Sequence, residues 1–203
     1  MLAEHLVYST AIAIVAGMIF FRYTGRDCSW IIVIVAYLPD MDKIAGPILR
    51  HFFGITVIFG YTIHRGVFHT VAAMFLFALI IAVLLHPFGV RYFDAFIFTA
   101  IGTGAHLLED ALVYPAGYMY LWPLSRDKAG LAWLSTGLNE ENYTATFFHI
   151  ANTEVLLIGL ALLVAAVLIR TRVEGPGWIR WYMPDSVYRK FFLSECGVTR
   201  KTP

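Results

Sequence analysis

The 203-residue sequence has few charged residues: Asp, Glu, Lys and Arg make up 14% of it, whereas 59% of its residues are hydrophobic. About a quarter of the residues in a typical soluble domain carry a charge, so this deficit excludes an ordinary soluble protein. The formal net charge of +1 lacks the basic excess of a nucleic-acid-binding protein, and we expect no nucleic-acid partner. The composition therefore indicates an integral membrane protein.

Cysteine is also scarce. Cys28 and Cys196 lie far apart and match neither the spacing of a zinc-binding motif nor that of a disulfide framework. A cleavable signal peptide is not expected, because the first apolar run has no charged region ahead of it and no small-residue cleavage pattern behind it. We therefore interpret that run as a membrane span that is retained.

What the sequence has instead is long apolar runs. They predict five spans, at residues 5–21, 28–38, 69–86, 91–112 and 147–169. The second is shorter than the roughly 20 residues of a full span. Residues 44–63 are apolar but interrupted by Pro47, Arg50 and Gly54, so they form either a further span or a re-entrant or interfacial segment. The expected fold is an all-α, polytopic transmembrane helical bundle of about five spans plus that segment.

We expect two parts along the chain: a transmembrane metal-site domain over residues 1–170, and a basic cytoplasmic or interfacial tail over residues 171–203. The basic residues from Arg170 onward are interpreted as an anchor to anionic lipid.

Histidines and aspartates lie at the ends of several apolar runs, and ionisable groups at membrane depth usually mark function. His106 and Asp110 are four residues apart, so one helix face presents both. Imidazoles and carboxylates together suit zinc first, with manganese or iron as alternatives, and the sequence leaves open one or two ions. The candidate metal ligands are His5, Asp40, Asp42, His64, His69, His106 and Asp110.

Other polar residues are candidates for roles in catalysis and substrate binding. His64 and Asp42 are candidates for a catalytic base and its orienting group, and Arg65 could hold a phosphate through its fork of donors. The predicted catalytic residues are thus His64, Asp42 and Arg65, and the predicted substrate-binding residues are Lys43, Arg65, Trp122 and Arg126. The alternatives are interfacial polar residues without a metal, and a snorkelling anchor in the case of Arg65. Glu109 is expected to be a solvated rim residue.

The arginines predict an orientation in the membrane. If residues 44–63 do not cross, then Arg22, Arg91 and the basic tail fall on one side, which the positive-inside rule makes the cytoplasm. At about 1.5 Å per residue, His106 lies about 22 Å from Arg91, short of the far edge of a roughly 30 Å hydrocarbon core. We therefore expect a protein of the cell membrane with a cytoplasmic C-terminus and a site toward the extracytoplasmic leaflet.

Four short motifs together resemble the YdjM-like family of membrane-bound metal-dependent hydrolases. They are LPDMD at residues 38–42, HRGVFHT at 64–70, HLLEDAL at 106–112 and WPLS at 122–125. An N-terminal histidine, His5, also matches, and the resemblance covers roughly residues 1–125. Lys43 stands where the family often has histidine, Phe68 where it has threonine and Thr70 where it has serine; the first departure bears on how many ions are held.

The resemblance implies hydrolysis, and the residues themselves suggest how. A bound metal lowers the pKa of its water and makes hydroxide available near pH 7, so we expect attack on an ester or phosphoester bond of a membrane lipid. The expected partners are that lipid substrate and the bilayer, and the oligomeric state is left open. The alternatives are a metal or proton transporter, and a non-catalytic structural membrane protein with a metal site.

Overall fold

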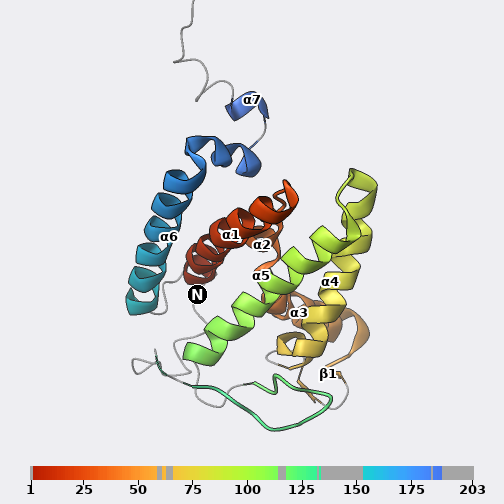
Figure 1. The fold of residues 1–203 in the computed structure, drawn as a ribbon. Helices are drawn as coiled ribbons and strands as arrows, with labels where there is room; N and C mark the ends of the chain where they lie inside the picture. Colours follow the sequence, from red (N-terminus) through yellow and green to blue (C-terminus); the bar gives the residue numbers. More distant parts are fainter. Residues whose placement is uncertain are drawn as a thin grey trace, which may run out of the picture.

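The computed structural model describes residues 2–58, 61–62, 66–113, 118–131, 133, 153–183 and 185–188 (Figure 1). This part of the chain is mostly helical. Its α-helices are α1 (Leu2–Thr24), α2 (Trp30–Val35), α3 (Asp42–Phe53), α4 (Val71–Leu85), α5 (Tyr92–Val113), α6 (Thr153–Glu174) and α7 (Asp185–Tyr188). Strands β1 (Val57–Ile58) and β2 (Tyr61–Thr62) form a small antiparallel ribbon. The 3-10 turns are η1 (Pro39–Met41), η2 (Val67–His69), η3 (His86–Phe88) and η5 (Pro176–Tyr182).

Among the described residues, four helices are long and apolar enough to cross a membrane: Ala3–Thr24, Val71–Phe88, Tyr92–Val113 and Thr153–Glu174. They present large apolar side chains outward; Leu79 of α4 is 57% exposed and Leu168 of α6 is 64% exposed. A helix satisfies its own backbone hydrogen bonds, so it can expose such side chains to lipid without cost. The expectation of an all-α polytopic membrane bundle is confirmed.

The bundle is built from two helix pairs with α2 between them. α4 packs against α5, α6 packs against α1, and α2 lies against both α1 and α5. Gly102 lets α2 approach closely, because a Cβ atom there would lie 3.0 Å from the Cα of Ile32 and 2.7 Å from Cγ2 of Val35. A small residue in this helix thus allows the close helix contact that is common between membrane helices. Ile32 and Phe98 are fully buried at this contact.

Residues 27–39 run along the length of the bundle although α2 itself has only six residues. At one end, Arg26 Nε donates to Asp94 Oδ2 over 2.7 Å in the first turn of α5. At the other end, Asp40 Oδ1 lies 3.7 Å from Nε2 of His69, and that nitrogen lies 3.6 Å from Asp110 Oδ2. The stretch of α5 from Asp94 to Asp110 rises about 24 Å. The short second apolar run therefore traverses nearly the same depth as the long helices.

Residues 42–69 leave the bundle and return to it at the same end. Asp42, the first residue of α3, has its Oδ2 atom 3.5 Å from Nδ1 of His69, the last residue of η2. Gly54, at φ +65°, ends α3 in the left-handed conformation that glycine adopts easily. α3 exposes Ile48 and Phe52 on one side. These contacts support the interpretation that the segment is re-entrant or interfacial and does not cross.

The opposite end of the bundle holds a second polar cluster that the sequence did not predict. Arg170 of α6 is fully buried, whereas we expected it to begin a basic surface anchor. Its Nη2 atom donates to Asp27 Oδ2 over 2.6 Å, and its Nε donates to Glu174 Oε2 over 3.0 Å. Its guanidinium also lies 5.0 Å from the ring centroid of Trp178 in η5. The reason is tertiary: Gly17 of α1 has no side chain to fill this space, and a Cβ atom there would lie 2.8 Å from Arg170 Nη1.

Candidate metal centre

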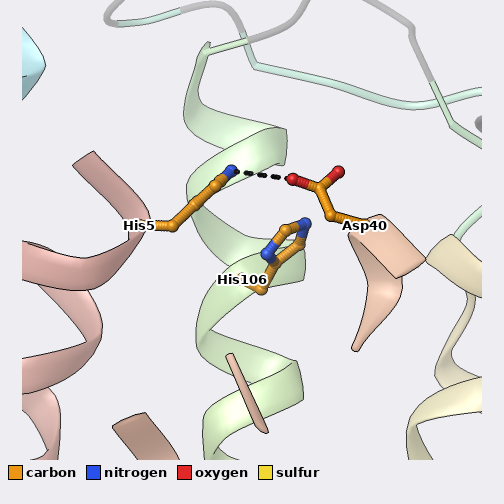
Figure 2. A group of neighbouring side chains, drawn as sticks. All are labelled: His5, Asp40 and His106. Carbon is orange, nitrogen blue, oxygen red and sulfur yellow. Dashed lines mark ion pairs between the residues drawn. The ribbon is translucent and has the colours of Figure 1, made fainter. Parts of the chain in front are cut away.

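Six of the seven predicted metal ligands are described, and the fold brings all six together. They come from the first turns of α1, from η1 and the start of α3, from η2, and from the second half of α5; Figure 2 shows three of them, His5, Asp40 and His106. They are His5, Asp40, Asp42, His69, His106 and Asp110. His64 and Arg65, predicted as ligand, base and phosphate-binding residues, lie outside the described residues.

The local sequence explains the positions of several of these residues at the ends or on one face of their helices. Pro39 occupies the first position of η1, where its missing N–H costs nothing, and Asp40 follows it. Thr70 caps α4 by accepting a hydrogen bond from the Ala73 N–H over 3.1 Å, so the helix begins just after His69. His106 and the aspartate four residues on lie on successive turns of one face of α5.

The donor atoms form two overlapping sets: His5, Asp40 and His106 in one, and His69, His106 and Asp110 in the other. Within each set the donor atoms lie within 4.8 Å of one another. His106 Nε2 lies 3.4 Å from Asp110 Oδ2, and His5 Nε2 lies 4.0 Å from Asp40 Oδ2 (Figure 2). Hydrogen bonds are about 2.7–3.2 Å long, whereas two ligands of one ion, each about 2.1 Å from it, lie roughly 3–4 Å apart. The spacing suits a shared cation better than direct hydrogen bonding.

Several of these atoms are buried without a hydrogen-bond partner in the described part of the chain. Both ring nitrogens of His69, both of His106 and Oδ2 of Asp110 have none, and each of these residues is at most 2% exposed. Buried polar atoms in folded proteins are nearly always satisfied, so a cluster of orphaned ones requires an explanation. Neutral imidazole nitrogens and carboxylate oxygens are ligands for zinc, manganese or iron(II). The residues therefore fit a divalent transition-metal ion.

Glu109 corrects the sequence interpretation, because it is 2% exposed and is no solvated rim residue. Its Oε2 atom lies 2.8 Å from Nδ1 of His5. When Glu109 accepts this bond, Nδ1 of His5 is the donor, and Nε2 of His5 faces Asp40 and Asp110, 4.0 Å from an oxygen of each. The spacing contained a signal for this: Glu109 is three residues from His106 and therefore shares its helix face.

Lys43 lies at the edge of the centre rather than free in front of it. Its Nζ atom donates to Asp40 Oδ1 over 2.8 Å, and its side chain is 34% exposed. Burial alone would raise the pKa of the Asp40 carboxyl, but its contact with His69 and the charges of His106, His5 and Lys43 outweigh burial and hold that pKa below its ordinary value. The Asp40 side chain is therefore a carboxylate, the form that binds a metal.

The segment of residues 118–131 meets the centre through Tyr118, a contact that the sequence did not predict. The ring of Tyr118 stacks on His69 with centroids 4.7 Å apart. The Tyr120 carbonyl accepts a hydrogen bond from the Val71 N–H over 2.8 Å, which ties this segment to the start of α4. The predicted substrate-binding residues Trp122 and Arg126 follow on the same segment, and Arg126 is exposed.

Comparison with known proteins adds one finding. The model of a family described as YdjM inner membrane protein matches residues 1–176, which include every ligand of the centre and all of α6. No curated protein and no solved structure matches the chain.

Proposed function

The chain belongs to the YdjM inner membrane protein family, and on that premise we propose that it is a membrane-embedded, metal-dependent hydrolase. The observation that carries the proposal is the set of buried, unpartnered imidazole and carboxylate atoms described above. Burying such groups inside a membrane bundle is costly unless they hold a cation or serve a function. His5, Asp40, His69, His106 and Asp110 would hold the metal, with zinc the first expectation and manganese or iron(II) next.

The metal, when bound, supplies a Lewis acid and lowers the pKa of bound water to near 7. The protein's own groups orient the ligands. Asp42, predicted as a metal ligand, a base or an orienting group, has Oδ2 3.5 Å from Nδ1 of His69, which is longer than a hydrogen bond and suits a further metal ligand. Glu109 lies 2.8 Å from Nδ1 of His5 and orients that ring. Such outer carboxylates fix the tautomer and the direction of a ligating imidazole.

The position of the centre supports a membrane lipid as substrate. It lies about 24 Å along α5 from the Arg26–Asp94 pair, at a depth where a lipid headgroup can be reached. Lys43 at its edge is a cation suited to phosphate oxygens, and we propose the same role for Arg126, which is exposed on the segment that carries Tyr118. We therefore propose a phosphoester or ester bond of a lipid, at the extracytoplasmic leaflet if the positive-inside rule holds.

A transporter would need polar groups that continue through the bundle. Below the centre, Ile32 and Phe98 are fully buried and belong to one apolar cluster, and the buried polar side chains that lie at that depth are only hydroxyls among the described residues of α1 and α5, at Ser9, Thr99 and Thr103. Between Asp94 and His106, α5 carries no charged side chain and no histidine. That arrangement favours hydrolysis over conduction of an ion.

The test uses three purified proteins: wild type, His106→Ala, and His86→Ala as a control in an exposed histidine outside the centre. Metal content is measured by elemental analysis, and hydrolysis by mass spectrometry of phospholipids in mixed micelles. We expect the wild type and His86→Ala to carry metal and cleave phospholipid, and His106→Ala to lose both. Wild-type metal content retained in His106→Ala would refute the site, and metal-loaded wild type without turnover of any lipid would refute the hydrolase.

A further inference from the structure

An apolar groove runs along the contact between α1 and α6, which lie side by side (Figure 1). Its volume is about 410 Å³, within the range of about 300–1,000 Å³ that ligand pockets occupy. α1 lines it between Tyr8 and Ile19, and α6 lines it between Leu162 and Ile169. Apart from the Tyr8 hydroxyl, the lining side chains are hydrocarbon. The groove therefore suits an apolar occupant.

Small residues create this groove. Ala11 and Ala166 line it and are buried, so they form its floor. Ile19 and Ile169 also line it and are about half exposed, so they stand at its edges. Because a methyl side chain leaves space that the larger neighbours on either side enclose, the groove stays open toward the surrounding lipid.

One end of the groove lies beside the candidate metal centre. His5 precedes Tyr8 by three residues and therefore lies on the same face of α1, one turn closer to its start. The phenol of Tyr8 lies within electrostatic range of Glu109, the carboxylate that is 2.8 Å from Nδ1 of His5. A molecule that lies in the groove thus has one end next to the centre.

The length of the groove distinguishes between possible occupants. From Tyr8 to Ile19, α1 rises about 17 Å, which is close to half of a roughly 30 Å hydrocarbon core. A lipid acyl chain extends through one leaflet and so matches this length. A helix of a second protein would need about 20 residues to cross the membrane, and the groove would cover only about half of it.

We propose that this groove seats one acyl chain of the lipid substrate, with the ester end of the chain toward His5 and the methyl end toward Ile19. The inference rests on the proposed function and adds the part of the substrate that the protein recognises. Lipid tails are as apolar as the lining side chains, so the groove contributes little affinity. Its role is to orient the bond to be cleaved at the centre, and orientation of this kind contributes to the rate of a reaction.

The test locates acyl chains on the protein by photolabelling, which does not depend on turnover. Purified protein is reconstituted into vesicles of phosphatidylethanolamine and phosphatidylglycerol. A small share of the phosphatidylglycerol carries a diazirine on one acyl chain, either near the ester or near the methyl end, and adducts are located by mass spectrometry. In wild type, we expect the ester-end probe to label Tyr8 and the methyl-end probe to label Ile19. Both should be labelled more than Leu79 of α4, which is exposed outside the groove.

Two variants of neighbouring residues on α6 separate the groove from the rest of the lipid-facing surface. Ala165→Phe fills the groove from an exposed position, and Val164→Phe is the control, because Val164 is also exposed but does not line the groove. We expect Ala165→Phe to lose most of the labelling at Ile19 and to keep its metal, and Val164→Phe to keep both. Ala165→Phe should also slow cleavage of long-chain phosphatidylglycerol but not of phosphatidylglycerol with butyryl chains.

Equal labelling of Leu79 and of the groove in wild type would overturn the inference, and this measurement requires no variant to fold. So would labelling in the reverse order of depth, or a groove without adducts, as expected where a second copy of the chain covers it. If the groove is labelled as expected but wild type cleaves no lipid, the acyl-chain site stands and the hydrolase fails. If Ala165→Phe cleaves the long-chain lipid as fast as wild type, the hydrolase stands and the role of the groove fails.

Discussion

Replacing Glu109 tests whether an outer carboxylate controls a metal ligand in this centre. Glu109→Leu removes the acceptor of the 2.8 Å hydrogen bond from His5 Nδ1 in a site where Glu109 is 2% and His5 1% exposed. A hydrogen bond to a charged group contributes about 1.5–3 kcal/mol. Loss of an outer-shell partner of a ligating histidine typically lowers metal affinity about 10–100-fold, which is about 1.4–2.7 kcal/mol. We expect metal affinity to fall within that range.

The conservative variant separates charge from shape. In Glu109→Gln the amide oxygen can still accept from Nδ1, but the bond is neutral and is weaker by about 1 kcal/mol. We therefore expect a loss of about fivefold for glutamine, smaller than the loss for leucine. Competition with a chelator of known affinity, in detergent micelles, measures both values.

Two controls make the result decisive. Leu108→Ala alters the neighbouring residue, whose side chain is 50% exposed on the outside of α5, and should leave affinity unchanged. The melting temperature of each metal-free protein shows whether Glu109 only stabilises the fold. If it does, the variant that loses more metal affinity should also have the lower melting temperature. Unchanged affinity in Glu109→Leu would refute the reasoning, and so would equal losses for glutamine and leucine.

Three further substitutions test the fold around the centre. Arg170→Met leaves a buried aspartate without its 2.6 Å partner and should cost about 3–5 kcal/mol of stability, measured by thermal unfolding in micelles, while the exposed Arg172→Met should cost little. Gly102→Ala places a methyl group 3.0 Å from the α2 backbone and should destabilise by about 1–3 kcal/mol; Gly104→Ala, which meets only a flexible methionine sulfur at 3.2 Å, should cost less. Thr70→Val removes the cap of α4 and should cost about 1 kcal/mol, and normal metal affinity in this variant would show that the cap does not position the neighbouring histidine.

The histidines and aspartates of the candidate centre could be singled out from the sequence because charge is conspicuous within apolar runs. His106 and Asp110 are spaced for one helix face, and Asp40 follows a proline at the end of a run. Counting membrane crossings along the chain places all of these side chains on the same side of the membrane. This count holds only if residues 44–63 return to the side from which they leave. The 3.5 Å contact between Asp42 and His69 satisfies that condition.

Glu109 and Arg170 were misread for a common reason. A sequence pattern assigns an isolated charge next to apolar residues to a surface, because that is where an unpaired charge costs least. Each of these side chains is buried against a partner far away in the chain: Glu109 against His5, and Arg170 against Asp27. Pairing changes the cost, and the partner is known only once the helices are placed side by side. The stacking of Tyr118 on His69 escaped prediction likewise, since this contact is tertiary.

Two ion pairs at the end of the bundle opposite the candidate metal centre help to bring together side chains from separate elements. The Arg26–Asp94 pair joins the end of α1 to the start of α5, and the Arg170–Asp27 pair joins α6 to the residue that leads into α2. With these ends fixed and Gly102 seating α2 against α5, the spacing of α1 and α5 at the far end is set by rigid helices. His5 and His106 come from those two helices and stack with centroids 4.1 Å apart. Ion pairs at one end of the bundle therefore preorganise a centre whose own carboxylates, without a cation, would repel one another.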